Sequence, residues 1–388
     1  MIFGERIIKV KRITKHHILK KILVVLFAFI GLILLINLPI ITLRNNKTNT
    51  DYSDWMSENI SYDKKVIDVA MLGAHDAFTQ DMNIMSKLDP YETNSIMQGT
   101  TGFLVKGFIY RQSKTQLATA TELLQSGVRY LDIRLSLDGD KWYTKHNYIS
   151  EEFDLIAEEI TEFLDNYPGE FLILDFQHID GVDYNDVYDY NLFYNMLDEY
   201  GLLEYAYNVN QLDSLTYGQL TNNGTVAKII IISKFTNSNT YVLSYDDSIR
   251  SNWADSDDFD FVINNLHEEA NDIDESSSMN KFRVMQAVTT MQISGSGILD
   301  ALGNWSLINR AKRFNSYLID SEDFDNLLIY LPIIMVDYAN TNANQFNDKI
   351  MQKIMDFNRN SWFFNFYIKK TKFREINPCI IKRNLIIY

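Results

Sequence analysis

The sequence has a single cysteine, Cys379, among 388 residues. An intramolecular disulfide needs two cysteines and a cysteine-based zinc cluster needs several, so both are excluded. Basic residues are also scarce, since 36 lysines and arginines face 51 aspartates and glutamates, for a formal net charge of -15. Binding to nucleic acid depends on lysine and arginine neutralising phosphates. The composition therefore argues against DNA or RNA as a partner.

The basic residues that are present concentrate at the two ends of the chain. Residues 1–21 form a basic leader, and an apolar run from Ile22 to Leu43 follows in which Asn37 is the only strongly polar side chain. A run of this length spans a bilayer, and the excess of basic residues before it orients the N-terminus inside. We expect a single-pass signal anchor over residues 22–43 in the cell membrane, with the main domain extracytoplasmic. A cleaved signal peptide is the alternative.

The segment 367–388 is a second basic region, in which lysines and arginines are interleaved with Phe373, Ile380, Ile381 and Ile386. Such a tail could lie on anionic lipid, or it could be solvated. The sequence does not decide between them.

Between residues 51 and 366, short apolar runs alternate with stretches of helical periodicity, which is typical of a repeated βα fold. Several of the runs are apolar at nearly every position, as in a parallel sheet that is covered on both faces. The pattern predicts one α/β domain, either a barrel or a doubly wound sheet. The strands are expected at 66–72, 128–135, 141–147, 171–176, 228–233, 282–288 and 331–338.

The stretch from Phe78 to Gln112 is long for a loop and carries apolar residues, among them Phe103 and Phe108. Loops of this length are usually functional or mobile. Two interpretations stay open: a lid or membrane-dipping segment, and a pair of short helices that pack on the domain.

Three of the four histidines of the main domain come at the ends of expected strands. They are His75, His146 and His178, whereas His267 lies among acids in an expected helix and is interpreted as solvated. The carboxyl ends of the strands of a parallel barrel line one mouth, where such folds place their active sites. Ionisable side chains occur at the same ends, and an aspartate in a buried strand is costly without a partner. These are Asp76, Asp132, Arg134, Asp175 and Asp337.

The strings LGAHDAFT, GVRYLDIRL, YTKHNYIS, EFLILDFQH, KIIIISKF and IIMVDYANTN occur in this order. They resemble the motifs of the phosphatidylinositol-specific phospholipase C X-domain family, more in its bacterial and X-domain-only members than in its large eukaryotic enzymes. The likeness covers roughly residues 55–350. It implies a distorted TIM-type barrel over residues 51–366 and cleavage of an inositol phospholipid to diacylglycerol and inositol 1,2-cyclic phosphate.

The resemblance also implies roles for individual residues. His75, oriented by Asp337, would be the general base, and His146, held by Asp76, would be the general acid. Arg134 would face the phosphate. The large eukaryotic members have an acidic residue at the Arg134 position that helps to bind calcium, so arginine there predicts that no metal is needed. The remaining substrate-contact candidates are Asp132, Asp175, Gln177, His178 and Lys234.

Two positions depart from the family pattern. Asn147 stands where a glycine often follows the second histidine, and Gln177 with His178 stands where the bacterial enzymes have a lysine. The substrate could therefore be another glycerophospholipid or a glycosylphosphatidylinositol-type anchor. A surface lipid-binding module without turnover is the non-enzymatic alternative. Phospholipid and membrane are the partners we expect, and the oligomeric state is not predicted.

Overall fold

A single curved sheet forms the centre of the molecule. The computed structural model describes residues 15–37, 48–237, 239–273, 278–292, 307–321 and 323–360. The sheet order is β7-β6-β5-β2-β1-β10-β9-β8, and all neighbours in this path are parallel. The two outermost strands, β7 and β8, are joined through the short helix α10. The strands are β1 (Met71–Ala74), β2 (Val128–Asp138), β5 (Phe171–Asp180), β6 (Lys228–Ser233), β7 (Val242–Ser244), β8 (Ile249–Ser251), β9 (Phe282–Ala287) and β10 (Ile333–Val336).

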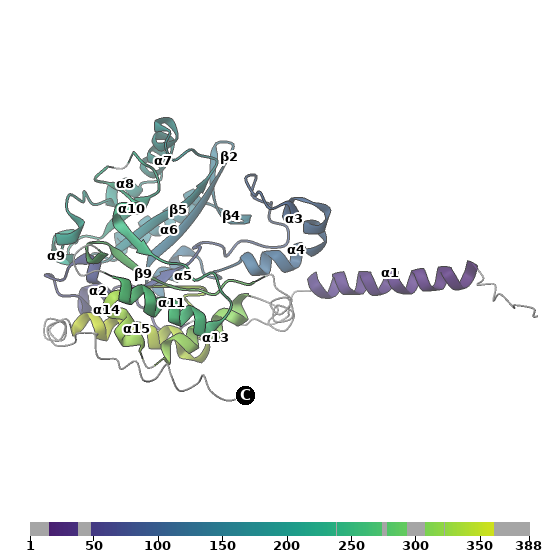
Figure 1. Ribbon diagram of the computed structural model, residues 1–388. Coiled ribbons are helices and arrows are strands. Elements are labelled where there is room, and N and C mark those ends of the chain that lie inside the picture. The colour runs from purple at the N-terminus through teal and green to yellow at the C-terminus, as the bar shows by residue number, and fades with distance from the viewer. Residues whose placement is uncertain are drawn as a thin grey trace, which may run out of the picture.

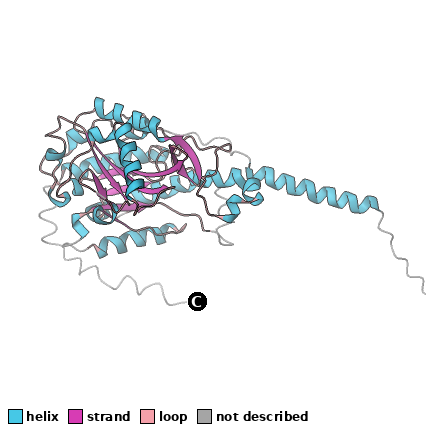
Figure 2. Ribbon diagram, turned by 90° about the horizontal axis from the view of Figure 1, so that it is seen from above, coloured by secondary structure: helices cyan, strands magenta, loops and turns pink. Residues whose placement is uncertain are grey.

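Helices surround this sheet, as the views in Figures 1 and 2 show. The longer connections are amphipathic helices whose apolar positions are buried, as in α6, α11 and α15. The predicted TIM-type barrel is confirmed as a curled, partly open α/β barrel. The helices around it are α2 (Trp55–Asn59), α5 (Ala120–Gln125), α6 (Phe153–Asn166), α7 (Val187–Glu199), α8 (Leu202–Tyr205), α9 (Tyr217–Leu220), α10 (Tyr245–Ser248), α11 (Phe259–Asp272), α13 (Leu307–Ile319), α14 (Phe324–Tyr330) and α15 (Phe346–Arg359).

One expected barrel strand has a different place. The strand β3 (Lys141–His146) pairs antiparallel with the end of β2 and with β4 (Tyr148–Glu152), so it is part of a hairpin rather than of the parallel barrel. The strand β2 extends past the other strands to Asp138, and β3 returns alongside it, with Thr144 opposite Leu135. His146 therefore comes back toward the mouth of the barrel from outside. The first expected strand is also shorter than predicted, because residues 66–68 form a 3-10 turn.

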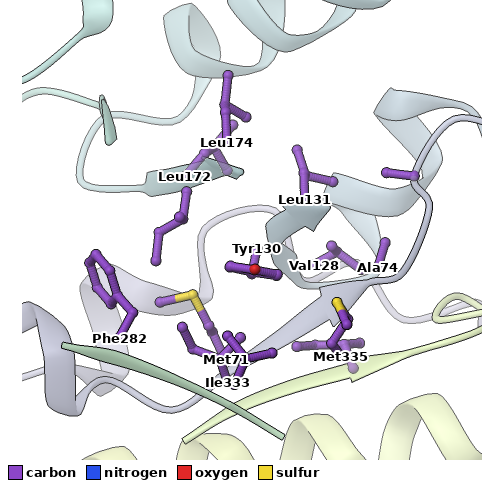
Figure 3. Packing of buried hydrophobic residues seen from close by; sticks show 14 of the residues in the cluster. Met71, Ala74, Val128, Tyr130, Leu131, Leu172, Leu174, Phe282, Ile333 and Met335 are labelled. Atoms are coloured by element: carbon purple, nitrogen blue, oxygen red, sulfur yellow. The ribbon is translucent and has the colours of Figure 1, made fainter. Parts of the chain in front are cut away.

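The packing at the centre of the sheet depends on a glycine. Tyr130 of β2 lies among buried side chains of β1, β5, β9 and β10 (Figure 3). A Cβ atom at Gly73 would stand 3.0 Å from a ring carbon of Tyr130, and the β1–β2 register shifts at this point. Glycine allows this close approach because it has no side chain. The Tyr130 ring is thereby held with its hydroxyl available to a polar partner.

The prediction of a single-pass membrane anchor is contradicted. Within the described residues, no helix is both long and apolar enough to cross a membrane. The helix α1 (Lys15–Asn37) begins in the basic leader, and residues 38–47 lie outside the described residues.

The segment 78–112 contains two helices, α3 (Ser95–Gln98) and α4 (Thr100–Ser113). The helix α4 lies between the barrel and α1 and contacts α1, α3 and α13 (Figure 1). The structure thus agrees with the interpretation of this segment as a pair of short helices. A function as a lid or as a membrane-dipping segment remains a prediction. The basic tail 367–388 lies outside the described residues.

Candidate active site

His75 is held at the carboxyl end of β1. Its backbone N–H donates to the Val336 carbonyl at 3.1 Å, which ties the end of β1 to the end of β10. The imidazole Nδ1 lies 2.8 Å from the Asp337 carboxylate. That contact assigns Nδ1 to the carboxylate, so Nε2 is the nitrogen available to a substrate. The side chain is 16% exposed, so a substrate can reach it.

His146 approaches the same place from the hairpin. Its Nδ1 lies 2.7 Å from the Ser113 carbonyl and 3.0 Å from the Asp76 carboxylate. The centres of the His75 and His146 rings are 6.4 Å apart, with the planes at 73°. Both imidazoles therefore offer Nε2 within reach of one small reacting group, and each is oriented by a carboxylate.

Arg134 lies next to His75 and pairs with Asp76, the carboxylate that contacts His146. Its Nε makes an ion pair with the fully buried Asp76, and its Nη2 lies 3.5 Å from His75 Nε2. Burial alone would raise the pKa of Asp76, but the charges of Arg134, His146 and His75 overcome this and lower it. Asp76 is therefore an anion that holds one guanidinium and one imidazole in place.

Three residues that follow site residues have left-handed backbone. They are Asp76 after His75, Asn147 after His146 and Tyr338 after Asp337, with φ of 40°, 64° and 54°. Side chains other than glycine adopt this region at a cost, which proteins accept mainly at functional sites. Asn147 thus supplies the conformation that glycine usually provides, because asparagine tolerates it better than most residues.

A second group of carboxylates lies deeper in the barrel. Asp132 of β2 and Asp175 of β5 are neighbours in register, and both are fully buried. The Tyr130 hydroxyl donates to Asp175 Oδ2, and the Asp76 backbone N–H donates to Asp132 Oδ2 at 3.2 Å. Among the described residues, the Oδ1 atoms of both aspartates have no hydrogen-bond partner. Burial and the Asp132 charge raise the pKa of Asp175 to about 8.

The other expected contact residues lie around Tyr245 of α10. Gln177 donates to the Tyr245 hydroxyl at 3.4 Å, and the Lys234 ammonium stands 5.1 Å from the centre of its ring. The β2–β5 register shifts between Ile133 and Arg134, so Arg134 pairs with the exposed His178 rather than with Gln177. The structure therefore brings Gln177 and Lys234 together and leaves His178 on the rim beside Arg134.

Sequence comparisons match part of the chain to phospholipases C. It is 34% identical over 145 residues to the variant-surface-glycoprotein phospholipase C of Trypanosoma brucei brucei, covering 33% of this chain and 39% of that protein. It is 31% identical over 137 residues to the human PI-PLC X domain-containing protein 2, covering 34% of this chain and 45% of that protein. The chain therefore resembles the phosphatidylinositol-specific phospholipase C X-domain family, as its motifs predict. It spans less than half the length of these curated relatives, and no family model matches it.

Solved structures extend the likeness over most of the fold. A variant of the Staphylococcus aureus phosphatidylinositol-specific phospholipase C matches with a TM-score of 0.54 at 14% identity, over 79% of this chain and 98% of that chain. The Listeria monocytogenes enzyme matches with a TM-score of 0.50 at 16% identity, over 80% of this chain and 99% of that one. At such low identity these matches establish the barrel fold and not its chemistry.

Within the described residues, one group at the candidate site has donor atoms that could bind a metal ion. His75, Asp76 and Asp132 each offer a ligand atom, and these atoms lie within 4.8 Å of one another. Carboxylate oxygens with one imidazole suit a divalent cation. The Arg134 guanidinium, however, is paired with Asp76 and would stand beside such an ion. The absence of a metal requirement remains a prediction.

The two histidines differ in how their surroundings affect protonation. Burial lowers the pKa of His75, but Asp76 and Asp337 outweigh it and raise the value to about 9. Burial also lowers the pKa of His146, and there the Asp76 charge does not compensate, because Arg134 and His75 act with burial. Near neutral pH the pair of histidines therefore carries one proton, and it resides on His75.

We expect the dependence of kcat/KM on pH to be bell-shaped. Acid-base catalysis needs one imidazole protonated and the other neutral, a state that exists only while the pair carries a single proton. Raising the pH through about 9 removes the proton from His75, and lowering it below the pKa of 6.5 that an unperturbed histidine has eventually adds one to His146. The limbs should lie near pH 9 and below pH 6.5 in assays with phosphatidylinositol vesicles. A His75→Gln variant that keeps the alkaline limb would contradict this.

Several residues of the site lie outside the set of candidates predicted from the sequence. Tyr130 shares a strand face with Asp132 and Arg134, so strand alternation could have found it. The other residues contact the site from distant segments of the chain, which the sequence alone does not indicate. They are Tyr245, Ser113, Thr115 and Gln116.

Proposed function

We propose that the chain is a phosphodiesterase of the phospholipase C type. It cleaves phosphatidylinositol, or a related inositol phospholipid, to diacylglycerol and inositol 1,2-cyclic phosphate. The observation that carries the proposal is the pair of imidazoles, each backed by a carboxylate, with an arginine between them at the barrel mouth. The family resemblance and the similarity to a named phospholipase C and to a PI-PLC X domain-containing protein support the substrate class.

The geometry fits an intramolecular displacement at phosphorus. A hydroxyl next to the phosphate is held close to the phosphorus atom by the inositol ring, so the attack needs no water. His75 takes the proton of this hydroxyl while its oxygen forms the new bond to phosphorus. His146 gives a proton to the departing diacylglycerol oxygen. Arg134 stabilises the charge that develops on the phosphoryl oxygens through its paired donors.

This assignment of roles uses the less populated protonation state of the free site. His75 has the raised pKa, so it is a strong base once it has lost its proton, and His146 is a strong acid once it has gained one. The opposite roles use the more populated state. We retain His75 as the base because the family resemblance and the Asp337 contact favour it. A substrate with a better leaving group distinguishes the two assignments.

The depth of the barrel offers groups for a headgroup with many hydroxyls. Asp132 and Asp175 each present one buried oxygen that has no hydrogen-bond partner in the described part of the chain, and Lys234 and Gln177 lie around Tyr245 near them. Such acceptors and donors suit ring hydroxyls better than a choline group, because choline has no N–H or O–H to satisfy buried acceptor oxygens.

A lipid panel tests the proposal. The full chain is incubated with vesicles that contain phosphatidylinositol, phosphatidylcholine or a glycosylphosphatidylinositol, and phosphorus NMR follows the products. We expect a cyclic inositol phosphate from phosphatidylinositol and no turnover of phosphatidylcholine, which lacks the neighbouring hydroxyl. Preferential cleavage of the glycosylated lipid would assign the anchor class instead. Binding to vesicles without any product would indicate a silent lipid-binding module.

The same assay tests whether a metal is needed. Because Arg134 supplies a positive charge beside Asp76, we expect turnover to be unchanged by a chelator such as EDTA. Loss of turnover with EDTA that added calcium restores would refute metal independence. It would also point to the His75, Asp76 and Asp132 donors as the ligands.

A further inference from the structure

A short segment between α4 and α5 contacts both halves of the site. This bridging segment, Ser113–Gln116, begins with the last residue of α4, and Ser113, Thr115 and Gln116 are buried. Its neighbours in space are the residues around His75, Asp337 and His146, which come from three other parts of the chain. It is thus placed to determine how these parts lie relative to one another.

Gln116 makes three hydrogen bonds around the pair of His75 and Asp337. Its Nε2 donates to the His75 carbonyl at 3.0 Å and to the Val336 carbonyl at 3.1 Å. Its Oε1 accepts from the Ala339 N–H at 3.1 Å. The side chain is fully buried, so water cannot take over these bonds. The Gln116 amide therefore links the backbone of His75 to the chain on both sides of Asp337.

The rest of the segment holds the three left-handed residues. The Thr115 hydroxyl donates to the Asp76 carbonyl at 2.8 Å, and the Thr115 carbonyl accepts from the Tyr338 N–H at 2.8 Å. The Ser113 hydroxyl accepts from the Asn147 side chain at 2.8 Å. Unfavourable backbone conformations persist only where their surroundings impose them. Here one segment supplies a contact to each of the three.

We propose that the bridging segment Ser113–Gln116 is a positioning element that aligns His75 with Asp337 and His146 with Asp76. It touches no reacting atom, so its residues act through the histidines. The inference rests on the proposed function only for its kinetic consequence. Its structural consequence is that the segment keeps the His75 imidazole at a constant distance from the Asp337 carboxylate. The titration of His75 reports on that distance whether or not phosphatidylinositol is the substrate.

Two substitutions test the alignment. Thr115→Val keeps the shape of the side chain and removes its hydrogen bonds to Asp76 and Thr79, and Gln116→Met keeps length and removes all three bonds. We expect kcat to fall by about 10-fold for the first and by up to about 10²-fold for the second, because small misplacements of catalytic groups are costly. KM should change by less than about threefold. Thr115→Ser, which keeps the hydroxyl, should restore most of kcat.

Histidine titration gives a readout that a general loss of stability does not move. In the full chain labelled with ¹³C-histidine, the His75 signal is identified by its loss in His75→Gln. In Gln116→Met, its pKa should fall from about 9 toward the unperturbed 6.5, since the contact with Asp337 is one of the causes of the raised value. If Gln116→Met does not fold, Thr115→Val carries the test.

Matched controls lie at the opposite end of the barrel. Thr221 is a buried threonine whose hydroxyl donates to the Tyr217 carbonyl, and Asn358 is a buried amide that bonds both backbone groups of Ala70, just before β1. Thr221→Val and Asn358→Leu should lower the melting temperature as much as the test variants do. They should leave kcat and the His75 titration unchanged.

The inference is overturned if Thr115→Val and Gln116→Met behave as these controls do, with unchanged kcat and unchanged His75 titration. A wild-type chain that does not turn over phosphatidylinositol would refute the proposed function. The titration arm would still decide the inference in that case.

Discussion

Replacing His75 or His146 with alanine is expected to lower the turnover of phosphatidylinositol by about 10²- to 10⁴-fold. Each imidazole has a carboxylate on its Nδ1 side and Nε2 left for the substrate, so alanine removes a proton-transfer group that the neighbouring residues cannot replace. The measurement is kcat in the full-length variants with phosphatidylinositol vesicles. His267→Ala is the matched control, because His267 lies on α11 away from the site, and its kcat should equal that of the wild type.

The nature of the leaving group distinguishes the acid from the base. An inositol phosphodiester with a 4-nitrophenolate leaving group needs no proton on departure, so loss of the general acid should cost little with this substrate. Under the proposed roles, His146→Ala recovers most of its activity with the nitrophenyl ester and His75→Ala does not. The reverse pattern would assign His75 as the acid, in agreement with the protonation of the free site. Wild-type rates in either variant would remove that histidine from the mechanism.

Substituting Arg134 is expected to lower kcat by about 10²- to 10³-fold for Arg134→Leu, the range found when one preorganised donor to a transition-state charge is removed. Arg134→Lys keeps a positive charge near Asp76 but loses the paired donors of the guanidinium, so its kcat should lie between that of the leucine variant and that of the wild type. Both are measured with phosphatidylinositol vesicles.

Arg134→Leu also leaves Asp76 buried without its guanidinium, which is destabilising, so each variant is first shown to be folded by its thermal transition. Arg250→Lys is the matched control, because Arg250 pairs with Glu269 through the same guanidinium nitrogen, Nε, outside the site. Full activity of Arg134→Leu would show that the arginine serves only to hold Asp76.

The strand pattern located the site because parallel strands impose a simple rule. Their carboxyl ends meet at one mouth, so His75 and Asp337, which follow β1 and β10, could be expected to lie together. His146 was expected at this mouth for the wrong reason. Its strand is antiparallel, and the residue arrives there because β2 is long and the hairpin folds back along it.

The anchor prediction rested on the number of apolar residues from Ile22 to Leu43, and the structure contradicts it. Within the described residues, no helix is both long and apolar enough to cross a membrane, so an apolar run in the sequence did not by itself establish a spanning helix.

The sequence by itself indicated the fold class, the family resemblance and the residue types of the candidate site, because these depend on local periodicity and on short ordered motifs. Only the tertiary structure decided which groups touch. Asp76 pairs with both Arg134 and His146, the Asp132 and Asp175 carboxylates lie in register, and the bridging segment Ser113–Gln116 bonds to three distant turns. Such contacts join residues far apart along the chain, and they form only after strand register and hairpin geometry have brought the backbones together.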